Sequence, residues 1–143
     1  MEMPSRKQVK KVGTKVRRLD RGEGSAEDAR VVEKVIRSYR AQFSRPIGTT
    51  NMAIRRYAEH ARVEAEVTQR LKKKSTIIDK LKNRETTLSL DRMQDIGGCR
   101  AVVSDLVGLQ QLVDTVVDRL GSRVIHHDDY VDKPRGPVIG LIT

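Results

Sequence analysis

The chain has 143 residues and carries 29 Lys and Arg against 19 Asp and Glu, which gives a net charge of +10 at neutral pH. This length suits one domain, and the positive charge favours an anionic partner such as a nucleotide or RNA. With one cysteine, 3% aromatic residues and no long apolar run or signal peptide, the sequence excludes an internal disulfide and disfavours a zinc site or a base-stacking RNA reader. We therefore expect a cytoplasmic protein without a membrane partner.

The first stretch of the chain is strongly basic. Residues 1–24 include KKVGTKVRRLDRGEG and show no apolar periodicity, which predicts a disordered basic arm. A solvated tail is the simpler interpretation of this arm, and contact with RNA or the ribosome is the alternative. Ser25 followed by Asp28 is typical of a capping box, and apolar residues at helical spacing predict a helix to about Phe43.

The middle of the chain predicts two further helices. Pro46 and Gly48 in the stretch SRPIGTT predict a break, after which the second helix begins at about Asn51 and covers the stretch NMAIRRYAEHARVEAEVTQRL, which includes Arg70. In RLKKKSTIIDKLKNRE, Ser75 or Thr76 is a candidate N-cap for a short third helix. The apolar residues of that helix are Ile77, Ile78 and Leu81.

The last part of the chain predicts a strand, a helix and another strand. The run CRAVV suits a buried strand, and DLVGLQQLVDTVVDRLG gathers its apolar residues on one helical face. Asp105 favours the start of this helix, and Gly121 fits a left-handed residue at its end. Because RVIHHDDYV predicts a second strand, the segment forms a βαβ-like unit, and the predicted fold class is α/β.

A cluster of cations surrounds the apolar positions of the short third helix. Such a cluster attracts a polyphosphate, and the N–H groups at a helix start add donors. Taken alone, the cluster is more typical of a solvated helix face than of a phosphate site. Its members are Arg70, Lys72, Lys73, Lys74, Lys80 and Lys82.

Three further features bear on chemistry. Asp95 precedes the predicted strand, where a carboxylate can bind Mg²⁺ together with phosphate oxygens, although alone it reads as a loop acid. Cys99 fits a small buried hydrophobic residue better than a nucleophile. The run HHDD at residues 126–129 alternates across a predicted strand, so its side chains do not converge easily on a metal.

Three motifs together resemble the RelA/SpoT family of alarmone synthetases. These motifs are RLKKKSTIIDK, MQDIGGCRAVV and DYVDKPR, in that order and spacing. The resemblance implies transfer of pyrophosphate from ATP to the ribose 3′-hydroxyl of GDP or GTP, which makes ppGpp or pppGpp. It also implies a nucleotidyltransferase-like mixed sheet flanked by helices. Residues 25–135 would then be the N-terminal part of a synthetase domain.

The resemblance assigns roles to individual residues. By likeness to the family, Arg70 and Arg100 would sandwich the adenine of ATP, and guanidinium planes suit such stacking. Lys72 and Lys80 would bind its phosphates, with Thr76 beside them. Asp95 would be the Mg²⁺ ligand. The catalytic residues themselves are not assigned.

The tail departs from the family. After DYVDKP the family continues with a G-Y-R-[SA]-x-H segment whose Tyr stacks on guanine, whereas this chain reads RGPVIGLIT. Residues 136–143 can be encoded so that a shifted frame reads S-G-Y-R-A-Y-H, and we hypothesise a frameshift. The domain would then be incomplete, and we expect little or no catalysis by this chain and an exposed sheet edge that favours self-association.

Two alternative functions stay open. Some related toxins transfer pyrophosphate to the 3′ end of tRNA. The acceptor-binding segment that would distinguish them from ppGpp synthetases follows DYVDKP, where this chain differs from the family. A non-catalytic RNA- or ribosome-associated module is the other alternative, because a charge of +10 supports salt-sensitive binding to phosphates.

Overall fold

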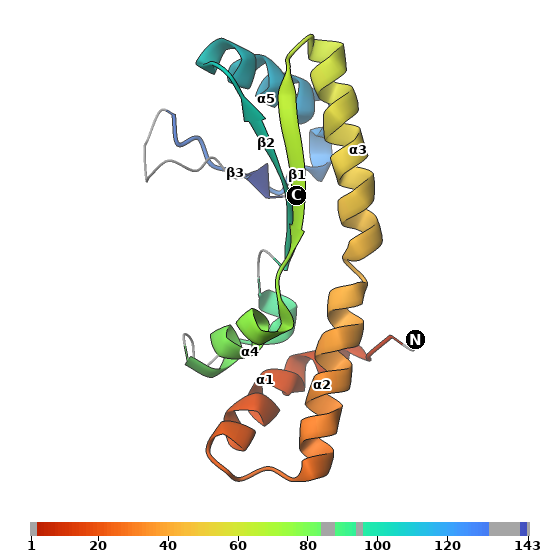
Figure 1. Ribbon diagram of the computed structural model, residues 1–143, viewed down its shortest axis with the longest axis vertical. Coiled ribbons are helices and arrows are strands. Elements are labelled where there is room, and N and C mark those ends of the chain that lie inside the picture. The colour runs from red at the N-terminus through yellow and green to blue at the C-terminus, as the bar shows by residue number, and fades with distance from the viewer. Residues whose placement is uncertain (1–2, 84–87, 94–95, 132–140, 143) are drawn as a thin grey trace. The chain divides into compact units, whose positions relative to one another are not determined.

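The protein mixes helices with short strands, as the computed structural model shows for residues 3–83, 88–93, 96–131 and 141–142. The chain forms two compact units, Met1–Pro46 with Leu71–Gly97 and Ile47–Arg70 with Gly98–Thr143. We call them the helical unit and the sheet unit. The described elements in chain order are α1 (Arg6–Asp20), α2 (Ala26–Ala41), α3 (Ser44–Ala61), β1 (Ala65–Leu71), α4 (Lys74–Asn83), η1 (Leu90–Arg92), β2 (Gly97–Val103), α5 (Leu106–Leu120), η2 (Gly121–Arg123), β3 (His126–His127) and β4 (Leu141–Ile142) (Figure 1).

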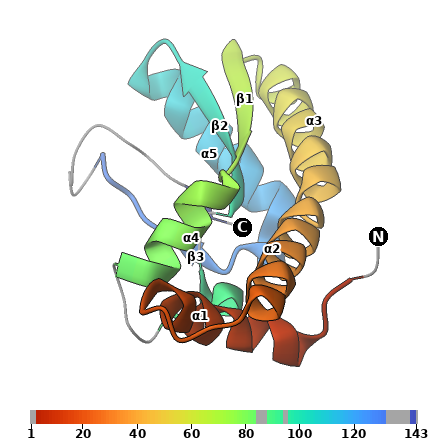
Figure 2. The ribbon, with the colours of Figure 1, turned by 60° about the horizontal axis from the view of Figure 1, so that its bottom comes forward.

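The helical unit is built from α1, α2 and α4, which lie side by side (Figure 2). Ile36 of α2, Leu81 of α4 and Leu90 of η1 are completely buried at its centre. Ser25 caps α2 with a full capping box to Asp28, as the sequence predicts. Burial of aliphatic side chains at a few kcal/mol each is the main term that holds such a unit together.

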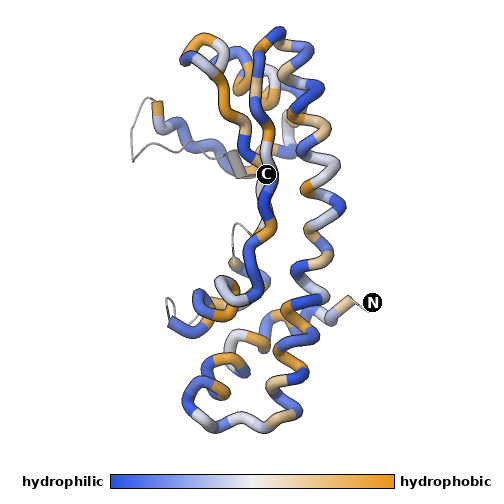
Figure 3. Tube along the Cα trace, viewed as in Figure 1, coloured by the Kyte–Doolittle hydropathy of each residue, from blue (hydrophilic) through white to orange (hydrophobic). Residues whose placement is uncertain are grey.

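The prediction of a disordered arm over residues 1–24 was wrong. Ser5 and Gln8 form a capping box at the start of α1, and the helix buries Val9, Val12 and Val16 in the core of the helical unit. These valines recur every three or four residues, but lysines, a glycine and a threonine fill the positions between them, and the colours of α1 alternate accordingly in Figure 3. The stripe is therefore narrow, and its tertiary partners decide its structure.

α1 also approaches the loop region of the helical unit closely. A Cβ atom built on Gly13 would lie 2.9 Å from the carbonyl oxygen of Leu88, so the helix needs a glycine there. Arg17, one turn later, donates to the carbonyl of Leu81 at 3.1 Å and to that of Leu88 at 3.3 Å. The arginine thereby satisfies one carbonyl in the last turn of α4, that of Leu81, and the carbonyl of Leu88 just before η1.

The sheet unit pairs β1 with β2 and covers one face of that pair with helices. Ala58 of α3 packs with Leu112 and Val116 of α5, and strand residues join this cluster. Exposure alternates along β2, so the odd-numbered residues from Gly97 to Val103 are covered and the even-numbered ones face solvent. The other face of the two strands is therefore open.

Two boundaries in the middle of the chain differ from the prediction. α3 begins at Ser44, because Pro46 falls in the first helical turn, where the backbone N–H has no partner within the helix. β1 lies within the stretch that we expected to be helical. Arg62, with φ of 56°, ends the helical path, and the alternation of Ala65 and Val67 with polar residues then forms the strand.

The last part of the chain confirms a strand at β2 and the helix α5, but not the βαβ-like unit. The prediction that the CRAVV strand is buried was wrong, because every second residue is exposed and Val102 is 47% exposed. Asp105 caps α5, and Gly121 has a positive φ of 53°, although its ψ of −122° lies outside the left-handed helical region. β3 pairs antiparallel with β4, and among the described residues the β2 sheet contains only β1 and β2. A two-residue strand such as β3 is too short to form a stable third strand beside β2.

No helix among the described residues is long and apolar enough to cross a membrane.

Candidate functional site

Arg70 and Arg100 extend from the two neighbouring strands of the sheet unit. Arg70 lies near the end of β1, Arg100 lies in the middle of β2, and both belong to the exposed side of the strand pair. Side chains on one face of paired strands are close enough for long residues to interact with the same ligand. The structure therefore brings the two predicted adenine-binding arginines onto one open surface.

Lys72 is fixed by its backbone in the helical unit. Its N–H donates to the carbonyl of Ile96 at 2.6 Å, and its own carbonyl accepts from Nε of Arg40 at 2.8 Å. The residue is 8% exposed, which is unusual for a lysine and places its aliphatic stem inside the unit. The position of Lys72 is thus determined by α2 and by the segment that enters β2.

The start of α4 carries the other phosphate candidates. The helix begins at Lys74, and the carbonyl of Lys73 accepts its first helical hydrogen bond from Ile77 at 3.0 Å. Ser75 and Thr76 therefore lie in the first turn instead of capping it, and the predicted N-cap was two to three residues late. Thr76 is exposed, so its hydroxyl faces solvent beside the first N–H groups of the helix.

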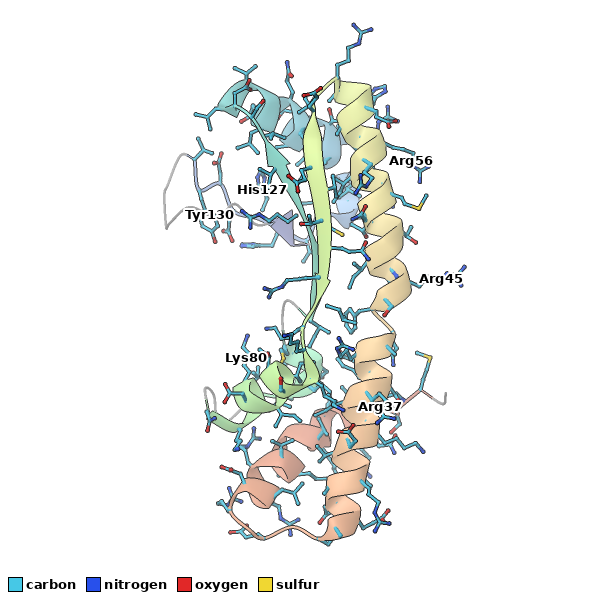
Figure 4. The ribbon with its side chains drawn as sticks, viewed as in Figure 1. Arg37, Arg45, Arg56, Lys80, His127 and Tyr130 are labelled. Carbon is cyan, nitrogen blue, oxygen red and sulfur yellow. The ribbon has the colours of Figure 1, made fainter. Side chains whose placement is uncertain are left out.

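The lysines of α4 have different surroundings. Lys74 pairs with Glu33 of α2, and that carboxylate also accepts from Arg37 at 3.1 Å. These hydrogen bonds hold the pKa of Glu33 below its ordinary value, the bond from Lys74 being the largest cause. Lys80 lies half-buried on the same helix, one turn after Thr76 (Figure 4). Lys74 is therefore engaged within the protein.

The predicted ATP residues divide between the two units. Lys72, Thr76 and Lys80 belong to the helical unit, while Arg70 and Arg100 belong to the sheet unit. The first set can supply ammonium, hydroxyl and backbone N–H groups to phosphate oxygens. The second set can supply guanidinium planes to a flat ring.

Asp95, the predicted Mg²⁺ ligand, lies outside the described residues. Ile96, which follows it in the sequence, is 2% exposed and accepts the hydrogen bond from Lys72. Among the residues that the structure describes, no three His, Cys, Asp or Glu side chains form a group that can hold a metal ion. A Mg²⁺ ion bound with an ATP molecule needs only one or two protein carboxylates, so Asp95 suffices chemically.

Cys99 and the HHDD run have ordinary structural surroundings. The Cys99 thiol is half-buried, donates to the carbonyl of Ile47 at 3.4 Å, and burial raises its pKa. A raised pKa opposes thiolate chemistry, which agrees with the expectation that Cys99 is not a nucleophile. His126 lies 2.9 Å from Asp128, and Asp129 accepts from the N–H of Val131 at 3.0 Å.

Arg40 is the functional candidate that the sequence analysis missed. It follows Val32 and Ile36 at intervals of four residues, so it continues the buried stripe of α2. A charged residue on that stripe is the signal that could have identified it, because such a side chain needs a polar partner. The partner is the carbonyl of Lys72.

Comparisons with known proteins add no assignment. No family model matches the chain, and no curated protein matches it.

Proposed function

We propose that this chain carries the ATP-binding part of a RelA/SpoT-type alarmone synthetase. The observation that carries the proposal is the shared open face of Arg70 and Arg100, because the three-motif resemblance requires these two arginines to act on one ring. The anchoring of Lys72 by Ile96 and Arg40 supports it, since a phosphate-binding lysine needs a fixed backbone. The finer fold of the proposal is a nucleotidyltransferase-like sheet flanked by helices.

The reaction of such a domain is transfer of a pyrophosphoryl group. The ribose 3′-oxygen of GDP or GTP attacks the β-phosphorus of ATP, the bond from that phosphorus to the α–β bridging oxygen breaks, and AMP leaves. The acceptor hydroxyl gives up its proton to solvent water as its oxygen attacks. Catalysis of this kind depends on positioning and charge neutralisation, which cations and a metal ion supply.

Each residue has a distinct task in this proposal. Arg70 and Arg100 hold the adenine between their guanidinium planes, and Lys72 and Lys80 neutralise the phosphates. Thr76 donates its hydroxyl to a phosphate oxygen. Asp95 would hold Mg²⁺, which neutralises phosphate charge when bound. We propose that this activity is cytoplasmic, where ATP and guanine nucleotides are available.

The first experiment measures ATP binding with and without Mg²⁺ by calorimetry. We expect Arg70→Gln, Arg100→Gln and Lys72→Gln each to weaken ATP binding about tenfold, because each removes one charged contact. Arg45→Gln is the matched control, since Arg45 is an exposed residue of α3 outside the proposed contacts (Figure 4). ATP affinity that is absent at millimolar concentration, or unchanged in all three variants, would contradict the proposal.

The second experiment identifies the acceptor. The chain is incubated with radiolabelled ATP, Mg²⁺ and either GDP, GTP or tRNA, and the labelled products are separated. Label on GDP or GTP supports alarmone synthesis, and label on tRNA supports the toxin-type alternative. Because the expected turnover is low, an Asp95→Asn variant sets the background for each acceptor.

A non-catalytic RNA-binding role is the second candidate. The solvent face of α1 carries lysines, among them Lys7, Lys11 and Lys15 around a shallow groove against α2. RNA binding through this face would fall steeply with salt and would persist in the Arg70→Gln variant. Binding that Arg70→Gln abolishes would instead assign the RNA to the proposed nucleotide residues.

A further inference from the structure

A basic pocket lies between α3 and α5 in the sheet unit, away from the open face of its strands. It has a volume of about 320 Å³ and is lined by Ala53, Arg56, Tyr57, His60 and Arg119. The first four of these recur at intervals of three, one and three residues, so they occupy one face of α3. Arg119 comes from the last turn of α5. We call this the α3–α5 pocket.

Two of the polar side chains of the α3–α5 pocket contact each other. Nη2 of Arg119 lies 3.0 Å from Nε2 of His60. Because a guanidinium can only donate, the His60 nitrogen is the acceptor of this contact. Tyr57 packs against the buried cluster of the sheet unit, so it forms a fixed wall. The pocket is thus part of a folded surface.

The charge of the pocket has no internal partner. Glu59 precedes His60 in the sequence, and Asp118 precedes Arg119. Within the described part of the chain, neither carboxylate forms an ion pair with Arg56 or Arg119. Two guanidinium groups in one hollow without a carboxylate favour an anion, and their planar forks match phosphate oxygens.

The size of the pocket limits the ligand. A single water molecule needs only about 10–15 Å³ of such space, so a volume of about 320 Å³ exceeds the needs of one small ion. Tyr57 and Ala53 also give the pocket an apolar side, which suits the sugar or base attached to a phosphate. A diphosphate, or a phosphate ester with its organic part, fits these features.

We propose that the α3–α5 pocket binds a phosphate ester or diphosphate group through Arg56 and Arg119. None of its lining residues belongs to the proposed ATP-binding set, so it is a second anion site. A free nucleotide and the phosphorylated 5′ end of an RNA present the same chemistry to it. On ligand binding, Arg119 shares its N–H groups between His60 and phosphate oxygens.

The test uses the methyl group of Ala53 as a local reporter. Its NMR signal is followed in the full chain during titration with inorganic pyrophosphate, with GDP, and with a short RNA carrying or lacking a 5′ phosphate. We expect a saturable shift with pyrophosphate and with either GDP or the phosphorylated RNA, which identifies the source. Absence of a saturable Ala53 shift with pyrophosphate at millimolar concentration overturns the proposal.

Variants separate this site from the proposed ATP site. We expect Arg56→Gln and Arg119→Gln each to weaken the pyrophosphate response about tenfold, and Arg56→Lys to weaken it less, because the charge remains without the fork. Arg45→Gln and Arg70→Gln should leave the response unchanged. Thermal unfolding of each variant shows that the fold is kept. An unchanged affinity in a folded Arg56→Gln/Arg119→Gln double variant overturns the proposal.

Discussion

The backbone N–H of Lys72 donates to the carbonyl of Ile96 at 2.6 Å. These two residues lie 24 positions apart in the sequence and belong to different motifs. Lys72 belongs to RLKKKSTIIDK and Ile96 to MQDIGGCRAVV. The carbonyl of Lys72 is bound on its other side by Arg40. A nucleotide site assembled from these motifs would therefore depend on backbone contacts in addition to its side chains.

The first prediction concerns Arg40. Arg40→Met keeps most of the aliphatic stem but removes the donor to the Lys72 carbonyl, which leaves that carbonyl without its side-chain partner in a buried residue. We expect a loss of about 1–3 kcal/mol in the free energy of unfolding, measured by urea denaturation. Arg37→Met, three residues earlier and exposed, is the control and should cost less than about 1 kcal/mol. Equal costs for both variants would count against the bond.

The second prediction concerns α1. Val12 is 1% exposed, so Val12→Ala removes two buried methyl groups and leaves a cavity in the helical unit. We expect destabilisation by about 1–2.5 kcal/mol in the same urea experiment. Thr14→Ala, on the exposed face of the same helix, should change stability by about 0.5 kcal/mol or less. A Val12→Ala protein as stable as the parent would mean that α1 does not pack on the core.

The third prediction concerns the pH dependence of the Glu33 interaction with Lys74. The pKa of Glu33 is lowered in the folded protein from its ordinary value of 4.5. The pair therefore stabilises the fold above about that pH, and the contribution is lost as the pH falls through the folded-state pKa. The effect is small, because the two side chains are 39% and 40% exposed.

Glu33→Gln and Lys74→Met are the variants for this measurement. Each should lower stability at pH 7 and approach the parent as the pH falls below about 4.5, because protonation removes the same interaction from the parent. The double variant should be less destabilised than the sum of the two. A pH-independent difference between Glu33→Gln and the parent would contradict the assigned ion pair.

The fourth prediction concerns Cys99. Its half-buried thiol has a raised pKa, so the reactive thiolate is scarce at neutral pH. We expect iodoacetamide to alkylate the folded chain much more slowly than the same chain in urea, as followed by mass spectrometry. Comparable rates in the two states would show that the sheet unit opens readily at Ile47 and Cys99.

The parts of the fold that could be predicted are those with wide apolar faces. α2 and α5 each present a broad stripe, with a capping residue at the start, and β2 ends in the apolar residues Ala101, Val102 and Val103. α1 could not be predicted in the same way, because its three valines are separated by cations and become a core only against α2 and α4. Tertiary contacts therefore determine that α1 is helical.

The candidate site was predicted only in part, for a related reason. Arg70 was placed on a helix, so its common face with Arg100 could not be foreseen until β1 was known. Arg62, which ends the preceding helix, has a positive φ without being glycine or asparagine, and its sequence gives no sign of this. The role of Arg40 depends on a carbonyl 32 residues away, which no local pattern encodes.

The closeness of Gly13 to Leu88 has a practical consequence for work on this protein. The basic N-terminal residues resemble a tail that can be trimmed to test what their charge does. Trimming them would strip a tightly seated helix from Ile36 and Leu81, both completely buried. A shortened protein would then lose nucleotide or RNA binding through collapse of its core. Charge is better tested by replacing exposed lysines of α1 one at a time in the intact chain.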